Sequence, residues 1–129
     1  MALKPVGFFR ELRHGMPNGP SLAESVRPET ASDEDKIVRY LQASPTFAAS
    51  GPMVDDVLDP SSKAVAPLET ATDGQWMWPR DLAYYVEKHH VELPEEFVNH
   101  MREQDWRPPE LTKAHLAELA AEFMKTIGS

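Results

Sequence analysis

Cysteine is absent from this chain of 129 residues, which excludes disulfide bonds, a thiolate nucleophile and any zinc or iron–sulfur site built on cysteine. No apolar run approaches the roughly 18 residues that a membrane-spanning helix needs. The first 15 residues carry charged side chains where a signal peptide would need an unbroken apolar stretch. We therefore expect a cytoplasmic protein with no membrane segment.

Basic residues are in the minority, at 13 against 21 acidic ones, and the formal net charge at pH 7 is -8. A protein that tracks nucleic-acid phosphates needs an excess of Lys and Arg, so DNA and RNA are not expected as partners. Residues 29–73 are the most negative part of the chain, with three basic and nine acidic residues. If the protein has a cationic partner, we expect it to bind there.

The signature sequences of common enzymes are also missing. The chain contains no GxGxxG, GxxxxGK(S/T), GxSxG or HExxH motif. An enzyme built on this sequence would need an unusual site made of carboxylates or histidines. We expect a protein without catalytic activity and without a cofactor.

What is present describes an ordinary globular domain. Hydrophobic residues make up 41% of the chain and charged residues 26%, at a length typical of one domain. We assign residues 1–107 to a single α+β domain. After the stiff Pro108–Pro109 break, residues 108–129 repeat apolar side chains at helical spacing, which predicts an amphipathic helix packed on the same domain.

Two short helices are predicted near the N-terminus. Phe8 and Leu12 lie four residues apart, which predicts a helix with one apolar face over residues 6–13. Ser21, followed three residues later by Glu24, has the spacing of a capping box that starts a second helix.

Three longer helices are predicted between these two and the C-terminal helix. Ser32, followed by three acidic residues, is expected to cap a helix that reaches about Ala43. Pro79 and Pro94 are each expected to open a helix, because proline is well tolerated in the first helical turn.

The clearest strand signal is Asp73–Gly74, a two-residue turn that needs positive φ and is flanked by strand-like residues 68–72 and 75–78. A further short strand is predicted at residues 46–50. The expected fold class is α+β, with a small antiparallel sheet around the Asp73–Gly74 hairpin, flanked by N-terminal and C-terminal helices. Two or three of these helices are expected to pack on one sheet face.

Trp76 and Trp78 lie two apart on a predicted strand, so both side chains point to one face, and Tyr84 and Tyr85 follow on the next helix. This aromatic cluster has two interpretations. It is either a stacking platform for a ligand or the sheet face that a helix covers, and large aromatics in a small domain mostly build the core.

Asp55, Asp56 and Asp59 form the second candidate cluster. Three carboxylates this close could gather a cation or act as a general acid/base pair, but a solvated acidic loop is the favoured interpretation, and a docking surface for a basic protein comes next. A third cluster joins Glu96 and His100, four apart on one helix face, with His89 or His90. The spacing of these histidines matches no established metal signature, and we expect no metal site.

The segment DGQWMWPRDLAYYV of residues 73–86 and the VELPEEF of residues 91–97 resemble a pattern found in small uncharacterised bacterial proteins, chiefly actinobacterial. The opening VGFFREL of residues 6–12 is similar to some of them, so the resemblance covers residues 6–107. It implies a shared fold unit and a bacterial cytoplasmic setting. It implies no activity and no site residue.

Small size, acidity and the lack of catalytic motifs favour a non-catalytic binding module that docks a basic protein through residues 29–73, as a toxin-neutralising immunity protein would. One alternative is a small-ligand binder or minor enzyme that uses Trp76 and Trp78. Another is a self-associating scaffold in which the C-terminal helix pairs between chains. The residues expected at that contact are Leu116, Leu119 and Phe123.

Overall fold

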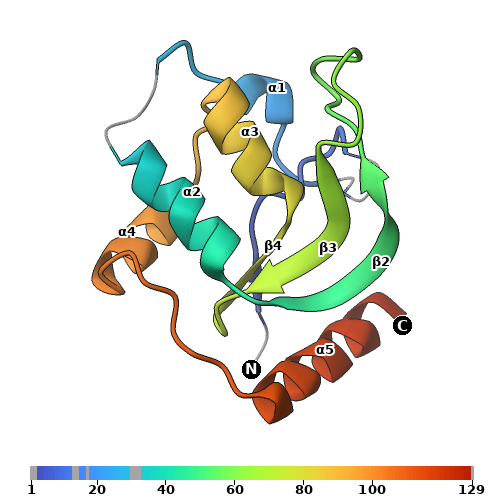
Figure 1. The fold of residues 1–129 in the computed structure, drawn as a ribbon, viewed down its shortest axis with the longest axis vertical. Coiled ribbons are helices and arrows are strands. Elements are labelled where there is room, and N and C mark those ends of the chain that lie inside the picture. The colour runs from blue at the N-terminus through green and yellow to red at the C-terminus, as the bar shows by residue number, and fades with distance from the viewer. Residues whose placement is uncertain (1–2, 13–14, 17, 30–32, 129) are drawn as a thin grey trace.

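The computed structural model describes residues 3–12, 15–16, 18–29 and 33–128, and within these ranges the chain forms four strands and five helices (Figure 1). The strands are β1 (Lys4–Pro5), β2 (Thr46–Val54), β3 (Ala66–Thr72) and β4 (Trp76–Pro79). The helices are α1 (Leu22–Ser25), α2 (Glu34–Ala43), α3 (Asp81–His89), α4 (Glu95–Glu103) and α5 (Lys113–Gly128). The predicted α+β class is confirmed.

The sheet has the strand order β1-β4-β3-β2 in the described part of the chain. β3 pairs antiparallel with both β2 and β4, as the hairpin prediction requires. β1 is an edge strand that the sequence did not predict. It runs parallel to β4 and places Lys4 opposite Trp76. A two-residue strand has too few positions to show an alternating pattern.

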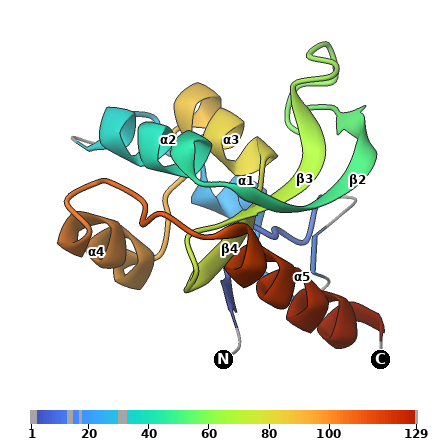
Figure 2. The ribbon, with the colours of Figure 1, turned by 60° about the horizontal axis from the view of Figure 1, so that its bottom comes forward.

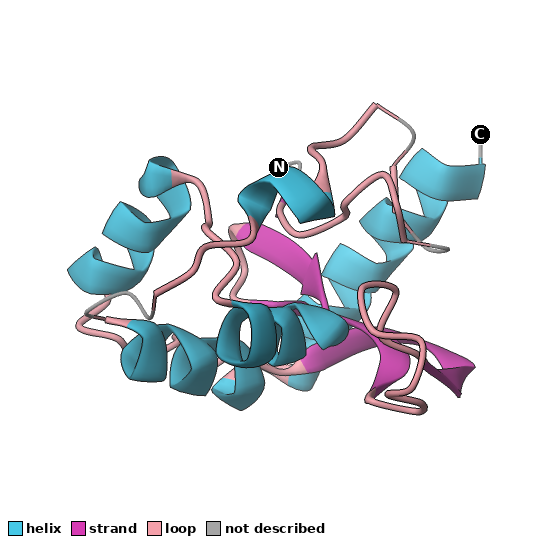
Figure 3. Ribbon diagram, turned by 90° about the horizontal axis from the view of Figure 1, so that it is seen from above, coloured by secondary structure: helices cyan, strands magenta, loops and turns pink. Residues whose placement is uncertain are grey.

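Helices lie on both sides of this sheet, and not on one face as the sequence led us to expect, because the C-terminal helix packs on the opposite side from α2 and α3. α2 and α3 pack against each other on one side, and α5 crosses beneath the strands next to β2 (Figure 2). Seen from above, the strands form a narrow band between the helices, and long loops join the elements (Figure 3).

The main core is aromatic. The side chains of Trp78, Tyr40 and Phe97 are at most 1% exposed. The Trp78 ring centroid lies 5.4 Å from that of Phe97 and 6.2 Å from that of Tyr40, and Phe97 also packs 4.8 Å from Trp76. These contacts join β4 to α2 and α4. The rings are tilted and not stacked face to face, as aromatic pairs prefer.

The β3–β4 hairpin is present, but its turn differs from the prediction. Thr72 pairs with Met77, so four residues rather than two separate the paired positions, and only Gly74 in this turn has positive φ. The reason is the buried Asp73 carboxylate. Its Oδ1 atom accepts the backbone N–H groups of Gln75 at 3.0 Å and Trp76 at 2.8 Å, which stabilises an Asx turn.

Two predicted helix assignments are wrong. Residues 6–12 form no helix: Gly7 has a φ of 81°, and the backbone N–H of Val6 donates to the carbonyl of Met77 instead. Pro79 is the last residue of β4 rather than the first of α3, and Arg80 is the N-cap. Proline has no N–H to donate to a β-ladder, and β4 ends at this residue.

The other helices agree with their sequence signals. Ser21 caps α1, where its Oγ atom accepts the N–H of Glu24 at 3.3 Å. α2 ends at Ala43, and α4 begins directly after Pro94. The expected cap of α2, Ser32, lies outside the described residues.

Candidate functional site

The aromatic cluster belongs to the core. Trp76 is 6% exposed and Trp78 is 1% exposed, so neither indole offers an open face to a ligand. Tyr84 is partly buried, and its hydroxyl donates a 2.8 Å hydrogen bond to Asp56. The structure supports the core interpretation of the two tryptophans and gives Tyr84 a role inside the protein.

Asp56 is the most buried member of the acidic loop, with 2% of the residue exposed. Its Oδ2 atom accepts hydrogen bonds from Tyr84 and from Nε2 of His89, the latter at 2.6 Å. Its Oδ1 atom accepts the backbone N–H of Leu58 at 2.7 Å. Burial raises the pKa of Asp56, but these hydrogen bonds outweigh burial and hold the pKa below its usual value. Asp56 therefore fixes the β2–β3 loop to α3.

The other two loop carboxylates also have partners within the loop. Asp55 accepts the backbone N–H of Ala64 at 2.9 Å and lies 3.6 Å from the Lys63 ammonium. Asp59 accepts hydrogen bonds from the hydroxyls of the two neighbouring serines, at 2.6 and 2.8 Å. These contacts are those of a structured loop, and they bring Asp55 and Asp59 to no shared site with Asp56.

Three histidines each meet a buried carboxylate from another part of the chain. His89 meets Asp56, Nδ1 of His90 lies 3.0 Å from Glu34, and Nε2 of His100 lies 2.8 Å from Asp73. The separate partners keep the histidines apart. Glu96, the fourth member of the cluster considered above, pairs with Lys4 at 2.7 Å. Among the described residues no group of three potential ligands surrounds a metal position.

The C-terminal helix uses part of its apolar stripe within its own chain. Leu119 is 5% exposed, and α5 lies next to β2. Leu116 is partly buried, and the side chain of Phe123 lies outside the described part of the chain.

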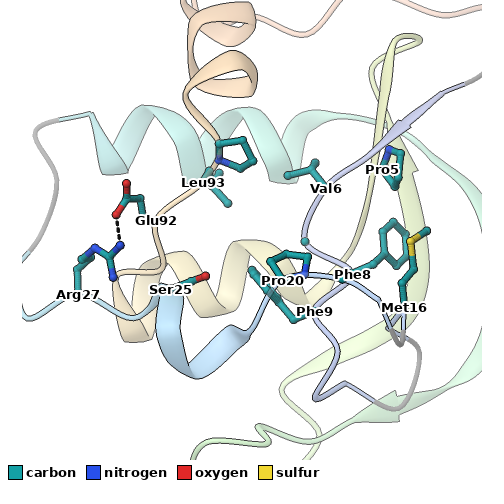
Figure 4. Close-up of a pocket in the computed structure, with 13 residues that line it drawn as sticks. Pro5, Val6, Phe8, Phe9, Met16, Pro20, Ser25, Arg27, Glu92 and Leu93 are labelled. Atoms are coloured by element: carbon teal, nitrogen blue, oxygen red, sulfur yellow. Dashed lines mark ion pairs between the residues drawn. The ribbon is translucent and has the colours of Figure 1, made fainter.

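A largely apolar cavity lies elsewhere, between the N-terminal segment, the residues on either side of α1 and the segment before α4 (Figure 4). We call it the apolar pocket. Its volume is about 420 Å³, within the range of small-molecule sites. The buried side chains that line it are Val6, Phe8, Phe9 and Leu93, and the exposed apolar ones at its rim are Pro5, Met16, Pro20 and Pro94.

Backbone contacts position the wall of this pocket. The N–H of Met16 donates to the carbonyl of Phe8, and the N–H of Glu92 donates to the carbonyl of Ser25 at 2.8 Å. Gly7 allows the wall to lie close to α3, since a Cβ atom there would come within 2.8 Å of Leu82. The N-terminal segment therefore forms a fixed wall of the apolar pocket, although it has no regular secondary structure there.

One end of the apolar pocket is polar. Arg27 and Glu92 form an ion pair there, and Figure 4 shows this pair at the opposite end from Phe8 and Met16. A cavity with a buried apolar lining and a few polar groups at one end can hold a small amphiphilic molecule.

Sequence reasoning missed this pocket because three separate segments form it. A signal was nevertheless present. Phe8, Phe9 and Met16 are large apolar residues beside a stretch rich in glycine and proline, and such a stretch marks a loop and not a helix.

Among the described residues no helix is both long and apolar enough to cross a membrane. Comparison of the chain with models of protein families, with curated proteins and with solved structures gave no match. The resemblance to small actinobacterial proteins stays a prediction.

Proposed function

We propose that this protein is a non-catalytic binding module of the bacterial cytoplasm whose ligand is a small, largely apolar molecule held in the apolar pocket. The observation that carries the proposal is the pocket's construction. Phe8 and Phe9 are 8% and 3% exposed, yet both line a cavity whose rim reaches solvent at Met16, which is 38% exposed. Burial of an apolar ligand against such a lining is favourable in proportion to the area removed from water.

Binding of N-phenyl-1-naphthylamine, a neutral dye that fluoresces in apolar surroundings, tests this proposal. We expect saturable binding to the wild-type chain and about tenfold weaker binding to Met16→Asp, because a carboxylate at the rim opposes entry of an apolar molecule. Met53→Asp is the matched control, since Met53 is 51% exposed and lies on β2, away from the pocket. No dye binding, or equal loss in both variants, would overturn the proposal.

Docking of a basic protein at residues 29–73 is a second proposal. The observation in its favour is that Glu29, Asp35 and Asp55 present exposed carboxylates. An oligolysine peptide should then bind more weakly as salt rises, and Asp35→Asn combined with Asp55→Asn should weaken it further. Glu103→Gln combined with Glu110→Gln is the control, and equal binding by both double variants would count against this surface.

A further inference from the structure

A second, smaller pocket adjoins the apolar pocket. Its volume is about 260 Å³, and it is lined from α2, from the end of α3 and from the residues that precede α4. Arg27, Glu92 and Leu93 line both cavities. We call this second cavity the acidic pocket. The Arg27–Glu92 ion pair lies at the boundary between it and the apolar pocket.

Carboxylates outnumber cations in the acidic pocket. Its lining includes one guanidinium, that of Arg27, and four carboxylates. These carboxylates belong to Glu29, Asp33, Glu34 and Glu92. A concave surface lined by one sign of charge concentrates ions of the opposite sign.

The guanidinium at the boundary is already engaged. Nη1 of Arg27 donates to the carbonyls of Glu24 at 2.9 Å and Val26 at 3.1 Å, and Nη2 pairs with Glu92. An incoming anion would have to displace Glu92 and would meet the remaining carboxylates. An incoming cation does not have to displace Glu92, because it would share that carboxylate with Arg27 and meet Glu29 in the same lining.

The other charged groups at this end do not reverse the balance. His90 lies 3.0 Å from Glu34, and Arg102 lies 3.4 Å from Asp33. With both pairs formed, Glu29 and Glu92 still face a single guanidinium, and the whole chain carries a net charge of -8.

We infer that the ligand is an amphiphilic amine, with its apolar body against Phe8 and Phe9 and its ammonium group beside Glu92 and Glu29. This inference rests on the proposed function, since the apolar pocket supplies the site and the charge beyond Arg27 selects the head group. Inorganic cations lack the apolar body, and fatty acids carry the wrong charge.

Three ligands with the same chain test the inference: octylammonium, octanol and octanoate, each used to displace bound N-phenyl-1-naphthylamine at pH 7. We expect octylammonium to bind about fivefold more tightly than octanol and octanoate to bind most weakly, with the advantage shrinking as salt is added. Equal affinities, or tightest binding of octanoate, would overturn the inference and leave the proposed function standing. Failure of all three to displace the dye would overturn both.

Two variants locate the head group. Glu29→Gln and Glu92→Gln should each lower octylammonium affinity about threefold while octanol affinity stays constant. Glu103→Gln removes an exposed carboxylate outside both pockets and should leave the affinities unchanged. An equal effect of all three substitutions would indicate long-range charge alone and would overturn the assignment.

Discussion

Nε2 of His100 lies 2.8 Å from Oδ2 of Asp73, a residue that is only 2% exposed. The same Oδ2 atom accepts the hydroxyl of Tyr40 at 2.6 Å, while Oδ1 holds the turn between β3 and β4. One buried carboxylate thus joins α2, α4 and the hairpin. Burial and the nearby Asp73 carboxylate together raise the pKa of Tyr40, so its hydroxyl stays protonated and donates.

Replacement of Asp73 by alanine should therefore lower the stability of the fold strongly. It leaves the hydroxyl of Tyr40 and the backbone N–H of Trp76 as buried donors without their acceptor, and we expect a loss of about 3 kcal/mol or more in the free energy of unfolding. Urea denaturation followed by circular dichroism measures it. Asp35→Ala, on the exposed face of α2, should cost less than about 1 kcal/mol. Similar losses in the two variants would show that the Asp73 network contributes little.

Arg80 adds to the C-terminal cap of α2, where Ser44 already donates to the carbonyl of Tyr40. Its guanidinium donates to the carbonyls of Leu41 at 3.1 Å and Ser44 at 2.6 Å, and Nε donates to Thr46. Helix ends leave such carbonyls without intrahelical partners. We expect Arg80→Ala to lower the free energy of unfolding by about 2 kcal/mol.

Lysine should not rescue this position, because an ammonium cannot reproduce the planar fork of a guanidinium. Arg80→Lys is therefore expected to remain well below the wild-type stability in the same urea titration. A lysine variant as stable as the wild type would mean that charge alone, and not the hydrogen-bond geometry, stabilises the end of α2.

The Glu11 carboxyl is expected to make the free energy of unfolding depend on pH. Burial raises the pKa of its carboxyl, but hydrogen bonds from the N–H groups of Ala23 and Leu22 and from Ser21 outweigh burial and lower the pKa to about 2 from 4.5. A carboxyl with a depressed pKa in the folded state stabilises the fold above its unfolded pKa and loses that contribution as pH falls. Stability should decline between pH 4.5 and about 2.

Glu11→Gln tests this assignment. Urea titrations from pH 7 down to pH 3 should show a smaller decline for Glu11→Gln than for the wild type, and the variant should already be less stable at pH 7. Glu103→Gln, on an exposed face of α4, is the control and should keep the wild-type profile. Identical profiles for all three proteins would remove Glu11 as a source of the pH dependence.

Gly7 is a backbone requirement of the apolar pocket. Its φ of 81° disfavours any side chain, and a Cβ atom would meet the fully buried Leu82 at 2.8 Å. Gly7→Ala should lower the free energy of unfolding by about 2 kcal/mol and weaken dye binding. Asn18→Ala, at an exposed position nearby, should change neither. A fully stable Gly7→Ala variant with normal binding would show that the segment accommodates a side chain.

Local signals explain why much of the fold was predictable. Ile37, Val38 and Leu41 repeat at helical spacing and are all buried in α2, and Pro94 marks the start of α4. The hairpin was predictable from Asp73–Gly74. Its exact turn was not, because a side chain hydrogen bond and not the dipeptide alone decides the backbone conformation there.

Long-range pairs explain most of what sequence reasoning missed. Glu34 and His90 are 56 positions apart, and Asp56 and His89 are 33 apart, so no local pattern links them. The sequence predicted that the acidic residues of segment 29–73 form one binding surface. In the folded chain Glu34 and Asp56 turn inward, and the pocket arises from segments whose sequences give no common signal.

The parallel pairing of β1 with β4 also sets an order of events in folding. Lys4 lies opposite Trp76, so closing this pair requires a loop of about 70 residues, an entropic cost that antiparallel neighbours such as β3 and β4 avoid. During synthesis the N-terminal segment emerges before β4, so β1 can pair only after β4 has also emerged. The apolar pocket, which also needs the residues just before α4, should be among the last features to form on the ribosome, well after the hairpin beside it.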